Sequence, residues 1–302
     1  MSTLWLVATP IGNLGDLAPR AVDVLSHVGL VCCEDTRRTG LLLQHAGIRA
    51  ARLAVCNDHT ETSRIADVLA MLGEGRDVAI VSDAGTPGIS DPGERIVRSA
   101  LDAGYAVSAV PGPSAAIMAL TISGLATDRF VFEGFIPRKG HERAARIAEI
   151  AAEPRTTVLY EAPHRVLRTL DDLREACGND RVVVVTRELT KLHEEVVRGP
   201  LGTLDIGAPR GEYVLVIDGA PVDDRVASDD DVRAALRVEL TNGASTRDAA
   251  AAVAKGLGRP KREVYSLAIA LDRPSDGEND RDERGVDERG VDERGVDERD
   301  PR

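Results

Sequence analysis

The sequence predicts an α/β protein with two α/β domains, followed by a small helical domain and a disordered tail. The length of 302 residues corresponds to two domains at roughly 150 residues each. Short β-rich runs alternate with amphipathic stretches through most of the chain, which is typical of a mainly parallel sheet with helices on its faces. Apolar residues make up 43% of the chain, enough for a sizeable core.

The first domain is predicted to span residues 1–124. Its expected strands are 3–8, 30–34, 52–55, 78–82 and 106–110, and its expected helices are 19–28, 37–46, 62–72, 93–103 and 114–124. Pro19 suits the first turn of a helix, and Ser114 follows Pro113 where it can cap the helix after it.

The second domain is predicted to span residues 125–219. Its expected strands are 130–134, 156–160, 181–186 and 212–217, and its expected helices are 141–152 and 164–177. A further strand at 194–198 would add antiparallel pairing. Residues 220–230 are rich in Pro and Asp and are predicted to be a linker, and 231–272 a small helical domain. Residues 273–302 contain the pentapeptide Glu-Arg-Gly-Val-Asp three times between Glu283 and Asp297, which is too poor in apolar residues to build a core.

Charge and composition exclude several classes of protein. The net charge is −12, and residues 272–302 alone hold 13 acidic and 7 basic side chains, so the remainder is mildly acidic. This excludes a globally basic nucleic-acid binder, although not a local basic patch. No apolar run reaches the roughly 18 residues of a membrane span, and the first residues do not form a secretion signal. We therefore expect a cytoplasmic protein that makes no use of a membrane.

The four cysteines do not predict a metal site. Cys32, Cys33, Cys56 and Cys177 form no CxxC pair and no His/Cys cluster with metal-ligand spacing. They are expected to be reduced residues that pack as small apolar side chains.

Unusual residues gather in the segments that follow the predicted strands. These are residues 9–13, 34–37, 57–59, 82–88, 111–115, 133–138, 161–165 and 187–191. Ligands of open α/β sheets bind beyond the carboxyl ends of the strands, so one site is expected at this edge. Glycine lets a backbone approach a ligand and proline fixes the shape of a loop, which together predict a rigid backbone wall. The chain contains no GxGxxG, GxxxxGK[ST], GxSxG or HExxH motif, which disfavours the familiar dinucleotide, triphosphate, hydrolase and zinc-protease sites.

The same segments resemble a known family. VATPIGNLGDLAPRAVDVL, CCEDTRRTGLLL, NDHTE, IVSDAGTPGISDPG, VPGPSA, RFVFEGFIPRKG, LYEAPHR and TRELTK are similar to the tetrapyrrole-methylase superfamily, and more narrowly to its branch of small-subunit ribosomal RNA methyltransferases. Porphyrin-modifying relatives carry a glycine-rich first loop, whereas this chain has Thr9-Pro10-Ile11-Gly12-Asn13. The resemblance implies two α/β domains with S-adenosylmethionine in the cleft between them, and a homodimer. It implies cofactor contacts from Pro10, Asp83, Ala84, Gly85, Pro87, Ile89, Ser114 and Ala115.

The reaction implied by the resemblance is methyl transfer to the ribose 2′-hydroxyl of cytidine 1402 in the 16S rRNA of the small ribosomal subunit. We expect substrate binding and proton handling from Asp35, Arg37, Asp58, His59, Glu188 and Lys191, with the general base left open among them. Each also has a structural interpretation. Asp35 could cap the next helix, His59 could be a surface loop residue, and Glu188 with Lys191 could be a local ion pair. Glu161, His164 and Arg165 are expected to be structural.

RNA contacts are expected from local clusters. The candidate basic groups are Arg37, Arg38, Arg49 and Arg52; Arg138, Lys139, Arg143 and Arg146; and Lys255, Arg259, Lys261 and Arg262. Phe130 and Phe132 are predicted to pack in the core, and Phe135 to face the cleft. Two other functions stay open: a methylase of porphyrin precursors, and a non-catalytic ribosome-binding relative. An acidic protein lacks a strong general attraction to phosphates, so a shaped, partly assembled ribosomal target is expected.

Overall fold

The computed structural model describes residues 2–49, 52–57, 59–221 and 227–272. The chain divides into two compact units, Met1–Val222 and Asp223–Arg302. Asp58 and the predicted tail, residues 273–302, lie outside the described residues.

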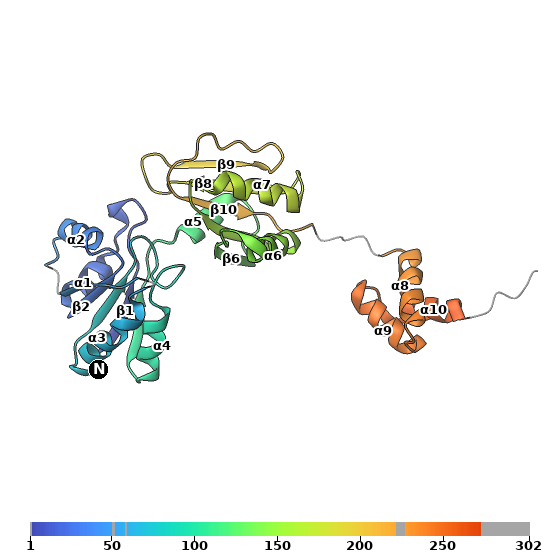
Figure 1. Ribbon diagram of the computed structural model, residues 1–302, viewed down its shortest axis with the longest axis horizontal. Helices are drawn as coiled ribbons and strands as arrows, with labels where there is room; N and C mark the ends of the chain where they lie inside the picture. Colours follow the sequence, from blue (N-terminus) through green and yellow to red (C-terminus); the bar gives the residue numbers. More distant parts are fainter. Residues whose placement is uncertain (1, 50–51, 58, 222–226, 273–302) are drawn as a thin grey trace, which may run out of the picture. The chain divides into compact units, whose positions relative to one another are not determined.

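The first part of unit 1 is a parallel sheet with helices on both faces (Figure 1). Its strands lie in the order β3-β2-β4-β1-β5, with β1 at Thr3–Val7, β2 at Leu30–Cys33, β3 at Arg52–Val55, β4 at Val78–Val81 and β5 at Ala106–Val110. The helices between them are α1 (Pro19–His27), α2 (Thr36–His45), α3 (Glu61–Gly73) and α4 (Glu94–Asp102), and a short 3-10 turn covers Leu14–Asp16.

Two cores hold this sheet between its helices. Leu25 of α1 and Leu43 of α2 pack with Val31 and Val81 on one face. Residues of α3 and α4, among them Leu72 and Ile96, pack with Leu4 and Ile80 on the other. Cys32, Cys33 and Cys56 are buried in these cores and all four cysteines are free. The predicted packing of three of them as small apolar residues is confirmed.

The second part of unit 1 is a mixed sheet in the order β6-β7-β10-β8-β9. Its strands are β6 (Phe130–Phe135), β7 (Thr156–Glu161), β8 (Val182–Arg187), β9 (Glu195–Pro200) and β10 (Tyr213–Ile217). β6 is parallel to β7, whereas the pairs β7–β10, β10–β8 and β8–β9 are antiparallel. The antiparallel strand expected near 194–198 is therefore present.

The two faces of the second sheet are covered by helices from different parts of the chain. α6 (Gly140–Ala152) and α7 (Val166–Cys177) pack on one face through residues such as Ile150 and Leu173. The other face is covered by α5 (Ala115–Ser123), whose Ala119 and Leu120 pack against Val158 and Val216. The predicted first domain, residues 1–124, thus ends in a helix that packs on the sheet of the second. This helix fastens the loop after β5 to the second sheet.

Unit 2 is a small bundle of α8 (Asp229–Thr241), α9 (Thr246–Gly256) and α10 (Lys261–Asp272) around its own apolar core. Ser228 caps α8 by accepting a hydrogen bond from the Asp231 N–H at 3.2 Å, and the Asp231 carboxylate accepts from the Ser228 N–H at 2.9 Å. This reciprocal cap starts the helix at Asp229, two residues before the predicted domain start and inside the predicted linker 220–230.

Candidate active site

The loops that follow β1, β4 and β5 meet because these three strands are neighbours. Thr9 and Gly85 pair through their backbones, with N···O distances of 2.9 and 3.1 Å. The Thr86 hydroxyl donates to the Pro113 carbonyl at 3.2 Å. A Cβ on Gly112 would lie 2.9 Å from the Cβ of Ala8, so the loop after β5 crosses β1 at a distance that only glycine permits. The Gly/Pro-rich loops therefore form one continuous wall.

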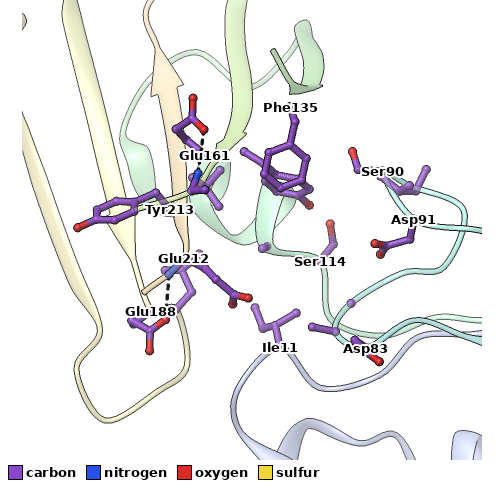
Figure 2. Close-up of a pocket in the computed structure, with 18 of the residues that line it drawn as sticks. Ile11, Asp83, Ser90, Asp91, Ser114, Phe135, Glu161, Glu188, Glu212 and Tyr213 are labelled. Atoms are coloured by element: carbon purple, nitrogen blue, oxygen red, sulfur yellow. Dashed lines mark hydrogen bonds between the residues drawn. The ribbon is translucent and has the colours of Figure 1, made fainter. Parts of the chain in front are cut away.

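These loops and the second sheet enclose a pocket of about 450 Å³, a volume typical of small-molecule sites (Figure 2). The first sheet's loops contribute Ile11, Asp83–Gly85 and Ile89–Asp91, and Ser114 and Ala115 lie at the start of α5. Asp83 and Ser114 therefore line the same hollow. The charged lining residues are Arg38, Asp83, Asp91, Glu161, Glu188, Lys191 and Glu212, so carboxylates outnumber cations.

The second sheet supplies the opposite wall. Figure 2 shows Glu212 approaching from the β10 side, while Asp91 and Ser114 lie on the opposite side. The ring of Phe135 lies 5.5 Å from that of Tyr160, measured between ring centroids, and Phe132 packs edge-on against Tyr160 at 5.1 Å. Burial raises the pKa of the Tyr160 hydroxyl, and hydrogen bonds with the Ala116 backbone and the Ser114 hydroxyl oppose that rise.

Asp83 connects the loops after β2 and β4. Its carboxylate accepts from the Arg38 guanidinium at 2.9 Å and from the Asp35 N–H at 3.2 Å, and the Asp83 N–H donates to the Glu34 carboxylate at 2.9 Å. Asp35 in turn caps α2 through the Arg37 N–H and forms a bidentate pair with the Arg37 guanidinium. These hydrogen bonds from Arg37 hold the pKa of Asp35 at about 2. The network fixes the rim of the pocket.

Lys191 is held by two carboxylates. Its ammonium lies 2.9 Å from Glu188 Oε1 and 2.9 Å from Glu212 Oε2. Burial acts to raise the pKa of Glu188, but its hydrogen bonds with Lys191 and the Glu212 N–H outweigh burial and leave that pKa below its ordinary value. Burial acts to lower the pKa of Lys191, but the same carboxylates outweigh it and leave that pKa raised. Both groups are therefore charged at neutral pH.

Strained backbone is concentrated around this pocket. In the described residues, the non-glycine residues with positive φ are Ser90 (61°), Glu188 (50°) and Thr190 (67°). Two of them line the pocket and Thr190 lies between two lining residues, Leu189 and Lys191. A β-branched residue in this region costs about 1–3 kcal/mol, and such strain gathers at functional sites.

Most of the predicted cofactor residues line the pocket: Asp83, Ala84, Gly85, Ile89, Ser114 and Ala115. Pro10 instead lines a neighbouring hollow with Leu14, Leu41 and Leu42, and Pro87 is buried in the turn beside the pocket. Ser114 occupies the N-cap position of α5, but its side chain makes no capping hydrogen bond. Its hydroxyl is thereby turned toward Tyr160.

Only some of the predicted catalytic residues line the pocket. Glu188 and Lys191 line the pocket. Asp35 and Arg37 are engaged with each other at the start of α2, and His59 is exposed in the loop after β3, an edge strand. Asp58 lies outside the described residues. The structure does not bring Asp35, Arg37 and His59 to this cavity.

Several lining residues are absent from the predicted cofactor and catalytic residues: Ser90, Asp91, Tyr160, Glu212 and Arg38, which the sequence assigns only to a basic RNA-contact group. Glu212 precedes β10, whereas the sequence prediction places the site in the segments that follow strands. Because β10 runs antiparallel to β7 and β8, its amino end lies beside their carboxyl ends. Knowledge that β10 pairs antiparallel with β7 and β8 would have indicated Glu212.

Some other expectations need correction. Phe130 is 36% exposed on the edge strand β6 and does not lie in the core, whereas Phe132 packs in the core beside α5 and Phe135 lines the pocket, as predicted. Arg143 is buried and pairs with Asp172 at 2.6 Å, so it does not belong to an exposed basic patch. Arg259 is likewise engaged with Asp229 and Glu263.

Glu161 has the structural role expected for it. Its buried carboxylate pairs with Arg165 at 2.8 Å and accepts a hydrogen bond from the Thr169 hydroxyl at 2.5 Å. Among the described residues, no group of three or more His, Cys, Asp or Glu side chains could hold a metal ion. Within the same ranges, no helix has the length and apolarity required to cross a membrane.

Comparison with known proteins now complements this geometry. The model of the tetrapyrrole (corrin/porphyrin) methylases matches residues 3–205, and the model of the RsmI C-terminal HTH domain matches residues 226–272. A protein of Synechocystis named ribosomal RNA small subunit methyltransferase I is 46% identical, over 90% of this chain and 99% of its own length. Its namesake from Escherichia coli is 44% identical, over 88% and 94%. The chain belongs to the ribosomal RNA small subunit methyltransferase I family of tetrapyrrole methylases.

Solved structures agree on the fold of this family member. Uroporphyrin-III-C-methyltransferase from Thermus thermophilus aligns with a TM-score of 0.52 at 22% identity and covers 72% of this chain and 94% of its own. The methyltransferase CobJ aligns with a TM-score of 0.58 at 20% identity, over 73% and 95%. The predicted fold class is confirmed.

Proposed function

We propose that this protein uses S-adenosylmethionine to methylate the ribose 2′-hydroxyl of cytidine 1402 in the 16S rRNA of the small ribosomal subunit. The observation that carries this proposal is the extent of the relationship. The small-subunit methyltransferases from Synechocystis and Escherichia coli align with 90% and 88% of the chain, whereas the solved uroporphyrin-III-C-methyltransferase and CobJ cover 72% and 73%. A domain match at residues 226–272 accounts for this difference.

The charge of the pocket disfavours a porphyrin precursor and suits the positively charged methyl donor. A porphyrin precursor carries many carboxylates, and a site for it would need basic residues in the cleft. Here Asp83, Asp91, Glu188 and Glu212 line the cleft with Arg38 and Lys191 as the cations. Such a lining favours a ligand with net positive charge, because each carboxylate adds negative potential in a partly desolvated site.

The same residues fit the methyl donor. Bound S-adenosylmethionine would supply an electrophilic methyl group on a sulfonium that carries positive charge. Ala84, Gly85 and Ala115 line the pocket together with the apolar residues Ile11 and Ile89. We assign donor binding to this wall and to Asp83 and Ser114.

The chain's own side chains then handle the acceptor. Glu188 and Lys191 are the predicted catalytic residues that line the pocket, and we assign them acceptor binding. Asp35 and Arg37 act through the Asp83 network at the rim. His59 and Asp58 are assigned to substrate binding outside the pocket.

We further propose that the protein is a cytoplasmic homodimer that acts on an assembled or partly assembled subunit. The net charge of −12 gives little general attraction to RNA, so shape must supply recognition. Equal methylation of protein-free 16S rRNA and intact subunits would contradict the preference for an assembled subunit. Light scattering of the purified chain tests the homodimer, for which we expect twice the monomer mass.

A transfer assay separates the candidate functions. The full chain is incubated with labelled S-adenosylmethionine and either small ribosomal subunits or a porphyrin precursor. We expect label in the subunit RNA and none in the porphyrin. Label in the porphyrin would establish the alternative methylase. Calorimetry with S-adenosylmethionine distinguishes a non-catalytic ribosome-binding protein, for which no donor binding would be observed.

A further inference from the structure

Two loops from different sheets fix one ammonium group at the pocket. Lys191 follows β8 of the second sheet, yet its side chain lies against the loop after β1 of the first. A Cβ on Gly12 would lie 2.3 Å from Lys191 Cγ and 2.9 Å from Thr190 Oγ1. Any side chain larger than hydrogen at position 12 would therefore displace Lys191. Gly12 has no positive φ, so close approach is the reason for glycine here.

A second glycine, Gly211, makes room for the Glu188 carboxylate that binds Lys191. A Cβ on Gly211 would lie 2.3 Å from Glu188 Oε1, the oxygen that accepts from the Lys191 ammonium at 2.9 Å and from the Glu212 N–H at 3.0 Å. Glu212 supplies the other carboxylate of the clamp, and it approaches the pocket from the start of β10 (Figure 2). The ammonium is thus bound on both sides.

The backbone that carries Lys191 is held in an unfavourable conformation. Glu188 and Thr190 both have positive φ, and the segment is closed by the Lys191 N–H to the Glu188 carbonyl at 3.0 Å and the Thr190 N–H to the Glu194 carboxylate at 2.6 Å. Strain of this kind persists only where surrounding contacts enforce it. The position of the Lys191 ammonium is therefore determined by two glycines that leave room for it, two residues with strained backbone and two carboxylates.

We propose that the Lys191 ammonium stabilises the negative charge that develops on the acceptor hydroxyl oxygen during methyl transfer, and that Gly12 and Gly211 position it for this role. The inference rests on the proposed function and assigns one residue to one step of it. In that step the sulfur–carbon bond breaks, the oxygen–carbon bond forms, and the hydroxyl proton passes to water at the pocket mouth. Lys191 keeps its own proton throughout. A fixed cation in a partly desolvated site acts on such an oxyanion more strongly than it would in water.

Arg38, the other cation that lines the pocket, is less suited to this role. Its side chain is 64% exposed, against 30% for Lys191, so its charge is more strongly screened by water. Lys191 is the more buried charge and is fixed from three elements.

The test compares Lys191→Met, Lys191→Arg and the matched control Arg98→Met, which removes an exposed charge on α4 outside the pocket. With small subunits as acceptor, we expect Lys191→Met to lower kcat by about 10²–10³-fold. Lys191→Arg should recover at least about tenfold of that loss, because it restores the charge. The rate of Lys191→Met should also keep rising with pH where the wild type has levelled, since its acceptor must ionise unaided. Arg98→Met should match the wild type.

A second variant tests the position of the charge without removing it. Gly12→Ala should lower kcat by at least about tenfold, whereas Gly40→Ala, a helix position with no neighbour within 4 Å, should not. Thermal melts and donor Kd are measured for every variant to separate unfolding from loss of chemistry. A Lys191→Met enzyme with wild-type kcat and wild-type pH profile would overturn the inference. If wild-type protein transfers no methyl group to subunits, the proposed function fails instead.

Discussion

Thr9 and Gly85 are joined by a reciprocal pair of backbone hydrogen bonds, although they lie 76 positions apart in the chain. The pair closes the gap between the loops after β1 and β4 and brings Ile11 into the wall beside Ala84. The pocket is thus bounded by backbone that its neighbours hold in place. Its properties should depend on the geometry of the loops as much as on individual side chains.

Gly85 is the position where this dependence can be measured. Its φ is +85°, and a Cβ there would make only ordinary contacts with Ile11 Cγ2 at 3.5 Å and the Pro113 carbonyl at 3.7 Å. Gly85→Ala should therefore lower the free energy of unfolding by about 1–2 kcal/mol through backbone strain, and weaken donor binding as the loop shifts. Gly75→Ala is the matched control, with φ +79° and no neighbour within 4 Å. It should cost similar stability and leave donor affinity unchanged. Equal donor affinities in both variants would contradict the prediction.

Asp83 offers a test of the rim network. Asp83→Asn loses the ion pair with Arg38 and weakens the acceptor for the Asp35 N–H. The pair is exposed on the Arg38 side, so the free energy of unfolding should fall by less than about 1 kcal/mol. Calorimetry should show donor affinity reduced by about tenfold, because the two loops lose their connection. Asp67→Asn breaks a comparable pair with Arg64 on α3, away from the pocket, and should leave donor affinity intact. A donor Kd that does not respond to Asp83→Asn would show that the rim does not hold the site.

Glu61 should be a stability residue. Its side chain is buried, and one carboxylate oxygen accepts from the backbone N–H groups of Gly93, Arg95 and Ile96 at 3.0, 2.9 and 3.4 Å, which caps α4 from the neighbouring helix α3. Glu61→Ala leaves these donors buried without a partner and should cost about 2–3 kcal/mol in denaturant unfolding. Glu94→Ala, an exposed change in the same helical turn, should cost less than about 1 kcal/mol. Similar losses for the two variants would contradict the cap.

The sequence predicted the first sheet nearly to its ends because local signals specify it. Each strand is a short apolar run, and Pro19 marks the start of α1 as expected. Strand β1 ends at Val7, one residue before its predicted end. The loops that follow these strands were located correctly, since their glycines and prolines stand out against apolar strands.

The strand order of the second sheet could not be predicted from the sequence, because it depends on contacts between residues far apart in the chain. The order β6-β7-β10-β8-β9 places Arg187 beside Tyr213, so Glu188 and Glu212 become neighbours. No periodicity in the sequence specifies that pairing. The packing of α5 on this sheet was also unpredicted, because α5 is apolar all round and its pattern selects no face.

Two ion pairs at the surface, each with a half-buried carboxylate, should shape the response to low pH. Hydrogen bonds from Arg37 hold the pKa of Asp35 at about 2, and hydrogen bonds from Arg155 hold that of Glu153 at about 2. Both values lie below the value of about 4 expected in the unfolded chain. The folded state therefore binds fewer protons, and stability is present above pH 4 and lost as pH falls toward 2. Denaturant unfolding at successive pH values should show this fall, and Arg37→Met with Arg155→Met should make it shallower. An unchanged slope in the double variant would contradict the assignment.

The position of the transferred methyl group in the RNA is the most direct test of the proposed function. Small subunits lacking the modification are incubated with the protein and isotopically labelled S-adenosylmethionine, and the 16S rRNA is digested and mapped by mass spectrometry. We expect one labelled methyl group per subunit, on the ribose of cytidine 1402. Label on a base, label at another nucleotide, or no label in RNA while the donor is bound would contradict it.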